Sequence, residues 1–548
     1  MVELSTSTLV ASHHTCDVSD ITYQNQQDTS RSDYGTINGE RRRSESPRRQ
    51  IGIISAVFII FNRMIGTGIF ATPSTILGFS GSIGLSLLMW IIGALIASAG
   101  MQVYIVWGTA LPHNGGEKNY LEHLIPRPRQ LITSIYAANA VLLGYAAGNS
   151  LVFAEYLLAS VDPSAPHSST TSVFSPVRVV AFLCLTAAAL LHGLHIPSGL
   201  KLQNGLGALK IIVLIIMVGT GVAALMGVLQ PGVTPPRNFS SWEKIWEGTQ
   251  TGGNVVCACL YNVIWSYIGF SNANYALAEI QNPGRTLRIA GPLAIITVTV
   301  FYLLCNIAYF SAASKEEITG SGRLVAALLF RNVWGVSAER LLNSFVALSA
   351  LGNVLSVSFS QGRVNQALGH ENVLPFSKFW SSSWPSNAPL AGLSLHWAVC
   401  NVIIFGLPAG DAYNFVINVI SYPLAVINAI ISFGLIYIAA KARWSYTALQ
   451  SRWERRHLSS PSNPTHDSER QPLIADSHSA IDTPQDVFFD LSPLSLLSAV
   501  VFGIASIFLF VMPLAKPPPG IKYYDHLPYW IHAAGGWGVF IIGGIWWW

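Results

Sequence analysis

Charged residues are scarce in this chain of 548 residues: Asp, Glu, Lys and Arg together make up 11% of it, whereas hydrophobic residues make up 51%. Soluble domains carry charge on about a quarter of their residues. The shortage therefore excludes a soluble protein with a fully solvated surface, and the mean hydropathy of +0.44 indicates a polytopic protein embedded in a lipid bilayer. The net charge of +4 is small, and we expect no nucleic-acid partner.

Cysteine is also rare, with six residues in the chain. Cys16 lies in a polar segment, and the others lie inside apolar runs: Cys184, Cys257, Cys259, Cys305 and Cys400. None of them has the spacing of metal ligands, so we interpret them as small buried hydrophobic residues. A nucleophile elbow, a phosphate-binding loop and a zinc motif are all missing. We therefore predict no enzyme activity, no metal site and no cofactor.

Two long polar stretches interrupt the apolar sequence. Residues 1–50 are rich in Ser, Thr, Gln and Arg and contain no apolar run, which predicts a disordered tail and excludes a signal peptide. Residues 441–487 include "SSPSNPTHDSERQ" and are predicted to be a linker. Residues 51–440 and 488–548 are then the membrane-embedded parts, the first a core of ten helices and the second a further pair.

The apolar runs predict an all-α protein with about twelve transmembrane helices, because a helix needs about 20 apolar residues to cross the hydrocarbon core. The predicted spans begin near Ile51, Ser82, Leu131, Val177, Leu202, Val255, Ile289, Ala338, Pro389, Ala412, Leu491 and Tyr529. A shorter run, from Gly322 to Val333, is predicted to lie along the outer surface.

Lys and Arg concentrate in the tail, in the loops after spans two, six and eight, and in the linker, which makes these segments cytoplasmic by the positive-inside rule. The loop after span five is then outside. It contains the sequon Asn238-Phe239-Ser240, so glycosylation is possible there.

The first span contains "FNRMIGTGIFATPS", which places two glycines where a continuous helix is expected. Each glycine lowers helix stability by roughly 1 kcal/mol relative to alanine. Irregular backbone at membrane depth is tolerated where it lines a cavity or is covered by protein. The sequence therefore predicts either an unwound segment beside a cavity or close packing of small residues against a neighbouring helix.

A second break is predicted in span six, where "WSYIGFSNANYALAEIQNP" places Ile268-Gly269 in a polar and aromatic stretch. Spans one and six hold corresponding positions in two halves of five helices each. Interrupted helices at corresponding positions indicate a substrate site near the midplane of a secondary transporter. We therefore favour a cavity at the first break as well.

The two breaks offer complementary backbone groups to a substrate. The amides of residues 67–69 would be free, at the positive end of a helix, which suits a carboxylate. The carbonyl groups near Trp265, Ser266 and Tyr267 would be unpaired, which suits an ammonium group. Together they predict a zwitterionic α-amino acid as the substrate.

These segments resemble the amino acid, polyamine and organocation transporter superfamily, within it the L-type amino acid transporter group, and most closely the fungal high-affinity methionine permeases. The resemblance rests on "NRMIGTGIFATPS", "WSYIGFSNANYALAEIQNPGRTLR", "GALK" and "QGRVNQALGHENVLP". It implies a five-plus-five inverted repeat with discontinuous helices one and six, followed by two extra helices. It also implies import of methionine or a similar neutral amino acid by alternating access.

The two breaks and the resemblance together predict the residues of the site. The predicted substrate-binding residues are Ile65, Gly66, Thr67, Gly68, Ile69, Trp265, Ser266, Tyr267, Gly269, Asn353 and Ser421. The predicted coupling or gating residues are Lys210, Arg63 and Glu279.

Lys210 matches a lysine that takes the place of a sodium ion in sodium-independent members of the family. It either stays charged and donates to the carbonyls of the span-one break, or loses its proton on burial, or extends its ammonium to the interface. Arg63 either pairs with Glu279 or another acid in a cytoplasmic gate, or reaches lipid phosphates. Because no sodium-site acids occur in spans one or eight, we favour proton coupling or exchange.

Partners and location follow from smaller signals. Animal members join a heavy chain through a cysteine between spans three and four, and this chain has none there, so we expect no disulfide-linked heavy chain. The plasma membrane is the expected location. "ERQPLI" resembles a dileucine sorting signal, which makes a vacuolar membrane the alternative. A broad neutral amino acid carrier and a non-transporting amino acid sensor are the alternative functions.

Overall fold

The computed structural model describes residues 51–113, 115–144, 146–162, 174–384, 388–408, 411–458, 489, 491–517 and 522–548, without the side chains of residues 276, 278, 279 and 443–458. The predicted tail and most of the predicted linker lie outside these residues. Within them every regular element is a helix, and the one isolated bridge pairs Ile51 with Ile280. The all-α prediction is confirmed.

Twelve apolar passages follow one another along the described chain. They are α1 (Ile53–Met64) with α2 (Gly68–Ala71) and α3 (Pro73–Ser80), α4 (Ile83–Ala110), α6 (Leu131–Leu143) with α7 (Ala147–Val161), α8 (Pro176–Leu194), α9 (Ile196–Leu225), α11 (Gly253–Tyr267) with the 3₁₀ helix η1 (Asn272–Glu279), α12 (Pro283–Ala312), α15 (Val336–His370), α17 (Leu390–Gly406), α18 (Asp411–Leu458), α19 (Pro493–Val511) and α20 (Ile531–Trp547).

Nine of these passages are long and apolar enough to span a bilayer, and α17 and α20 are shorter apolar helices of 17 residues each. The broken passage of α11 and η1 is the remaining one, and the passages follow the order predicted from hydropathy. Short helices connect the passages: α5 (Glu117–Leu124), α10 (Trp242–Trp246), α13 (Lys315–Gly320), α14 (Val325–Trp334), α16 (Ser377–Trp380) and η2 (Met512–Leu514).

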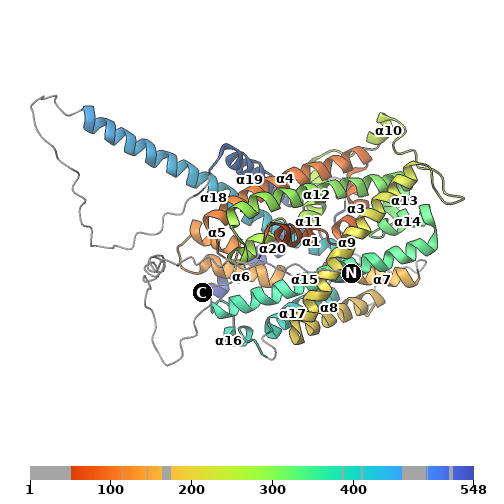
Figure 1. Cartoon of the computed structure of the whole chain (residues 1–548), viewed down its shortest axis with the longest axis horizontal. Helices are drawn as coiled ribbons and strands as arrows, with labels where there is room; N and C mark the ends of the chain where they lie inside the picture. Colours follow the sequence, from red (N-terminus) through yellow and green to blue (C-terminus); the bar gives the residue numbers. More distant parts are fainter. Residues whose placement is uncertain are drawn as a thin grey trace, which may run out of the picture. The chain divides into compact units, whose positions relative to one another are not determined.

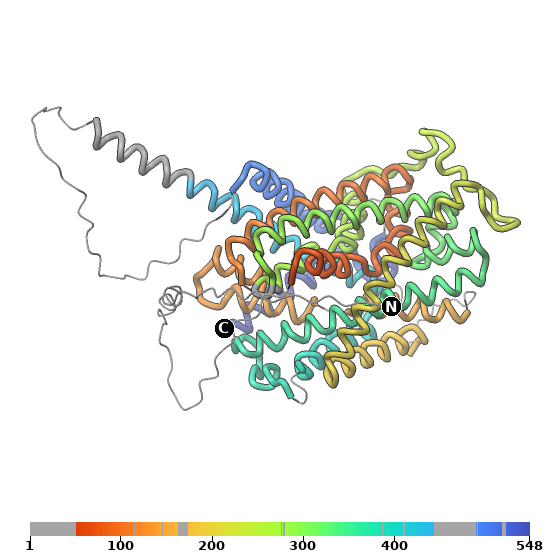
Figure 2. The backbone as a smooth tube through the Cα atoms, in the orientation of Figure 1, coloured from red at the N-terminus to blue at the C-terminus, as the bar shows by residue number. Residues whose placement is uncertain are grey.

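The predicted interruptions of spans one and six are confirmed. The helix of span one stops at Met64 and resumes at Gly68, and the helix of span six stops at Tyr267. Figure 1 shows α1 and α11 between α4 and α12 on one side and α15 on the other. In Figure 2 the α9 tube crosses α15, and a side-chain hydrogen bond between Lys210 and Asn353 joins these two helices.

Several predicted boundaries were wrong. The fifth passage starts at Ile196 instead of Leu202, and the seventh starts at Pro283 instead of Ile289, because a proline in the first turn and polar residues open each helix before its apolar run begins. Lys210 therefore lies near the middle of a 30-residue helix. Span ten also continues as α18 to Leu458, so the first residues of the expected linker are helical.

Two segments that are predicted to lie on the outer side make buried contacts in the structure. The short segment after span seven forms α14, which packs one face against the protein, with Val325 and Leu329 each 1% exposed, and leaves Arg331 and Trp334 exposed. The sequon residue Asn238 is buried, and its Nδ2 donates hydrogen bonds of 2.8 Å to the carbonyl oxygens of Phe310 and Ala313. Its side-chain nitrogen is therefore engaged in packing and is not available for a glycan in this fold.

Candidate substrate-binding site

The break in span one exposes backbone amides. Ile65 is extended, with φ −73° and ψ 90°, and its own amide makes the last hydrogen bond of α1, to Phe61. The next four amides, of residues 66–69, have no hydrogen-bond acceptor among the described residues. These donors lie at the start of α2, where the partial charge of a helix is positive. The segment is therefore ready to accept an anionic group.

The break in span six depends on a glycine. Ile268 is extended after the end of α11, and Gly269 has φ +124°, a backbone conformation that favours glycine. A Cβ atom on Gly269 would lie 2.5 Å from Cγ of Arg63 and 3.0 Å from its carbonyl carbon. The second break thus packs directly on the last turn of α1.

Two further glycines bring the breaks together. A Cβ atom on Gly66 would lie 2.0 Å from Nδ2 of Asn353, and one on Gly68 would lie 2.3 Å from Oγ and 2.8 Å from Cα of Ser266. Both of the alternatives that the sequence left open are therefore realised, since these glycines lie in an unwound segment and also pack closely against neighbouring helices.

Lys210 supports the span-one break from α9. Its Nζ donates to the carbonyl oxygens of Asn62 at 3.1 Å and Ile65 at 2.7 Å, and to Oδ1 of Asn353 at 2.8 Å. The side chain is 2% exposed, so it does not extend to the interface. Three acceptors match the three donors of a charged ammonium group. These are the contacts that a charged, structure-supporting lysine requires.

Tyr302 of α12 contacts both breaks and was missed by the sequence reasoning. Its hydroxyl lies 2.8 Å from the carbonyl oxygen of Met64 and 2.7 Å from that of Ser266. A hydroxyl has one proton, so it donates to one of these oxygens at a time. No described donor reaches the carbonyl oxygen of Tyr267, which leaves it free for a ligand.

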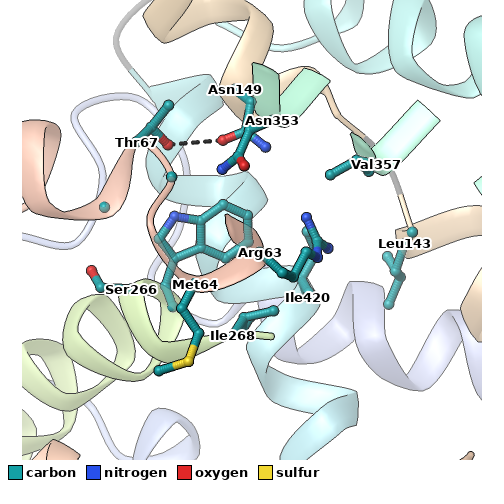
Figure 3. Close-up of a pocket in the computed structure, with 14 residues that line it drawn as sticks. Arg63, Met64, Thr67, Leu143, Asn149, Ser266, Ile268, Asn353, Val357 and Ile420 are labelled. Atoms are coloured by element: carbon teal, nitrogen blue, oxygen red, sulfur yellow. Dashed lines mark hydrogen bonds between the residues drawn. The ribbon is translucent and has the colours of Figure 1, made fainter. Parts of the chain in front are cut away.

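A cavity of about 110 Å³ lies between the two breaks (Figure 3). Thr67 and Asn149 are at one end of it, and Met64 and Ile268 are toward the other. Its lining is formed by Arg63, Met64, Gly66, Thr67, Gly68, Leu143, Gly144, Asn149, Trp265, Ser266, Ile268, Asn353, Val357 and Ile420.

The cavity includes many of the predicted residues but not all of them. Those that line it are Arg63, Gly66, Thr67, Gly68, Trp265, Ser266 and Asn353. Those that the structure places outside its lining are Ile65, Ile69, Lys210, Tyr267, Gly269 and Ser421. Ser421 donates to the carbonyl of Ile417 in its own helix, and its neighbour Ile420 faces the cavity instead. The side chain of Glu279 lies outside the described residues, so its pairing with Arg63 stays a prediction.

A third interruption contributes to the cavity. Span three is divided at Gly144, between α6 and α7, and the start of α7 supplies Asn149. The hydroxyl of Thr67 donates to Oδ1 of Asn149 at 2.9 Å (Figure 3). The mid-span sequence "LLGYAAGNS" contains glycines and an asparagine, and this is the signal that could have identified the break.

An ion pair covers the predicted outer side of the cavity. Arg323, just before α14, binds both carboxylate oxygens of Glu155 on α7, with Nε 2.7 Å from Oε2, and its guanidinium lies 5.3 Å from the ring centre of Tyr413. The hydroxyl of Tyr156 lies 2.9 Å from the carbonyl oxygen of Phe70 and 2.8 Å from that of Arg323. These contacts tie α2, α7 and the loop before α14 together.

Comparison with known proteins extends over almost the whole described chain. The sequence pattern of the amino acid permease family matches residues 51–540. The chain is 41% identical over 498 residues to the high-affinity methionine permease of Saccharomyces cerevisiae, which covers 91% of this chain and 78% of that protein. It is 30% identical over 435 residues to the low-affinity methionine permease of the same yeast (76% and 77%). It is 28% identical over 348 residues to the human b(0,+)-type amino acid transporter 1 (62% and 67%).

Replacing Gly68 by alanine tests the contact between the breaks. The new methyl group would meet the backbone of Ser266, so we expect Gly68→Ala to lower amino acid uptake by about tenfold or more. Gly78→Ala is the matched control, because no heavy atom lies within 4 Å of a Cβ at that glycine. Initial uptake rates in cells, normalised to surface expression, measure the effect. Equal uptake by the two variants would contradict the proposed contact.

Replacing Lys210 by methionine tests the support of span one. Lys210→Met leaves three buried acceptors without their donor, at a cost of about 1–3 kcal/mol for each unsatisfied group. We expect a lower melting temperature and loss of uptake. Lys201→Met, an exposed position on the same helix, should change neither. If both variants melt and transport like the wild type, Lys210 does not support the break.

Replacing Glu155 by glutamine tests the closure of the predicted outer side. Glu155→Gln removes the charge that holds Arg323, so the outer side should open more often. A cysteine introduced by Thr67→Cys should then react several times faster with a thiol reagent that does not cross membranes. The exposed Glu316→Gln is the control. An unchanged labelling rate in Glu155→Gln would show that the ion pair does not close this side.

Proposed function

Because this chain belongs to the amino acid permease family, we propose that it imports methionine, or a neutral amino acid of similar size, by alternating access. The observation that carries the proposal is the contact between the two interrupted helices. It places the free amides of Gly66, Thr67 and Gly68 in the lining of one small cavity, with the free amide of Ile69 and the free carbonyl of Tyr267 next to lining residues. Similarity to two yeast methionine permeases supports methionine as the substrate.

The backbone recognises the two charged groups of the amino acid. The substrate carboxylate accepts hydrogen bonds from the amides of residues 66–69, and its ammonium group donates to the carbonyl oxygens of Tyr267 and Ser266. Ser266 keeps one lone pair for this contact, since Tyr302 uses at most the other. Because these groups are common to all amino acids, the backbone selects the class of substrate and not its side chain.

The apolar part of the lining selects the side chain. Met64, Leu143, Val357 and Ile420 line the cavity and suit an unbranched, uncharged side chain. Small-molecule sites commonly enclose about 300–1,000 Å³. The observed cavity is smaller, so the site opens further to admit a substrate. A transporter that opens its site to one side of the membrane at a time is expected to do this.

Proton coupling and location complete the proposal. The Lys210 ammonium group occupies the support position beside the span-one break, and we propose that protons, rather than sodium ions, drive uptake. The transport core is residues 51–440, and the last two helices follow it. The plasma membrane is the proposed location, and a vacuolar membrane is the alternative.

Uptake by the purified protein in liposomes tests the proposed function. We expect labelled methionine to accumulate when the outside is more acidic than the inside, and unlabelled methionine and its close analogues to compete. Equal competition by leucine, phenylalanine and glutamine would replace the methionine assignment by a broad neutral carrier. Binding of methionine without any accumulation or exchange would contradict transport and indicate a sensor.

A further inference from the structure

A buried carboxyl group lies away from the cavity, at the start of α5 between spans two and three. Glu117 is 2% exposed. None of the ion pairs between described residues includes it. A buried carboxylate without a cation is costly unless hydrogen bonds replace the water it has lost. Glu117 therefore requires hydrogen-bond donors around it.

Hydroxyl groups from three separate passages converge on this carboxyl group. Tyr104 of α4 lies 2.7 Å and Tyr275 of η1 lies 2.8 Å from Oε1. Tyr136 of α6 lies 3.5 Å from Oε2. An ionised carboxylate only accepts hydrogen bonds, so all three hydroxyls donate to it in the charged state. The charge on Glu117 thereby joins spans two, three and six.

Tyr104 has a second acceptor in a fourth passage. Its hydroxyl also lies 3.0 Å from Oδ1 of Asn428 on α18, and its single proton serves one acceptor at a time. A protonated Glu117 accepts less strongly and has a proton of its own to donate. The hydrogen bond of Tyr104 is then free to move from α5 to α18. The protonation state of one carboxyl group thus determines which helices are joined.

The 3₁₀ helix η1 connects this carboxyl group to the cavity. Just before η1, Gly269 packs on Arg63, which lines the cavity. Further along, the ring of Tyr275 lies on the backbone of Gly116, where a Cβ atom would be 2.8 Å from Cε1 of the tyrosine. Tyr275 is 37% exposed, so the edge of the cluster reaches the surface of the protein although Glu117 itself is covered.

The remaining titratable groups of the neighbouring elements have other contacts. Lys118 donates to Glu371, directly after α15, at 2.6 Å, and Tyr120 donates to Asn274 of η1 at 3.2 Å. The others near α5 are Glu122, which accepts from Thr133 of α6, and His123, which packs against Trp107 and Phe489. Arg63 of α1 packs on Gly269 before η1 and lies close enough to Tyr275 to interact with it electrostatically. Glu117 is therefore the carboxyl group on which the tyrosine hydroxyls depend.

We propose that Glu117 is the proton-exchanging group of this transporter, and that its protonation releases η1 so that the cytoplasmic side of the site can move. The inference rests on the proposed proton-coupled import. When the outer side is open, the carboxylate takes a proton from a hydronium ion that enters through the cavity beside η1, so that an O–H bond of hydronium breaks as the carboxyl O–H bond forms. When the cytoplasmic side is open, the carboxyl O–H bond breaks and the proton passes to a water molecule on that side.

The direction of the pH dependence follows from the surroundings. Burial raises the pKa of the Glu117 carboxyl group, and the hydrogen bonds from Tyr104 and Tyr275 oppose this by stabilising the charged form. Loss of a donating hydroxyl raises the pKa further, and so the group is protonated at higher pH. A variant that lacks one hydroxyl should therefore work over a pH range shifted upward.

Two measurements on the full-length protein in liposomes test the inference. The first is accumulation of labelled methionine driven by an acidic outside, and the second is methionine exchange with equal pH on both sides. Glu117→Gln keeps the shape of the side chain but cannot take up a proton. We expect this variant to exchange methionine at close to the wild-type rate and to show no gradient-driven accumulation.

Matched controls separate the carboxyl group from the stability of α5. Glu122→Gln removes a charge from the same helix, and Glu371→Gln breaks the ion pair that ties Lys118 to the residue capping α15. Both should keep gradient-driven accumulation. If Glu117→Gln accumulates methionine with the wild-type pH profile, the inference is overturned while the proposed import stands. Wild-type liposomes that exchange methionine but never accumulate it would overturn proton coupling, and the inference with it.

Single hydroxyl deletions provide a test that does not need the Glu117 variant to fold. In Tyr136→Phe and Tyr275→Phe the pH of half-maximal uptake should shift upward, whereas in Tyr437→Phe, which is an exposed tyrosine of α18, it should stay unchanged. Unshifted profiles in both cluster variants would overturn the role of Glu117.

Discussion

The contact between two interrupted helices is the constraint on which the rest of the site depends. Gly68 meets Ser266, and Gly269 meets Arg63, at distances that leave no room for a Cβ atom. Each helix can therefore stop at membrane depth because the other covers its exposed backbone. Without this contact the free amides and carbonyls would face lipid, where each unsatisfied group costs several kcal/mol.

Side chains from neighbouring helices satisfy the groups that the substrate does not use. Lys210 donates to two carbonyls of span one, and Tyr302 joins the ends of both breaks. These residues leave the amides of residues 66–69 free, so the unsatisfied part of the backbone is the part that a carboxylate can bind. A substrate then completes the hydrogen bonding of the protein, which couples binding to the arrangement of the helices.

Hydropathy and glycine spacing predicted most of the fold. The length of a membrane span and the need to hydrogen-bond its backbone both constrain short stretches of sequence. The order of passages and the breaks at Gly66–Gly68 and Ile268–Gly269 could be predicted for this reason. The start of span five was wrong because a polar first turn precedes its apolar run. Tyr302 and Asn149 were missed because their roles depend on how α12 and α7 face the breaks.

The same limit explains the other differences at the site. Ser421 was chosen for its polarity, but its hydroxyl donates to the carbonyl of Ile417 in the same helix. The orientation of α18 presents Ile420 to the cavity instead. Glu117 looks like an ordinary loop residue in sequence, and its burial follows only from the packing of α4, α6 and η1. The chemistry of a side chain can be predicted from the sequence, whereas the structure is needed to know which faces of distant helices contact each other.

The central claim is that unpaired backbone at two breaks binds both charged groups of an amino acid. Competition against labelled methionine by two analogues, one without the carboxylate and one without the amine, tests it most directly. Since a hydrogen bond to a charged group contributes about 1.5–3 kcal/mol, each analogue should compete at least about tenfold less well than methionine. An analogue that lacks either group and competes as well as methionine would contradict the account.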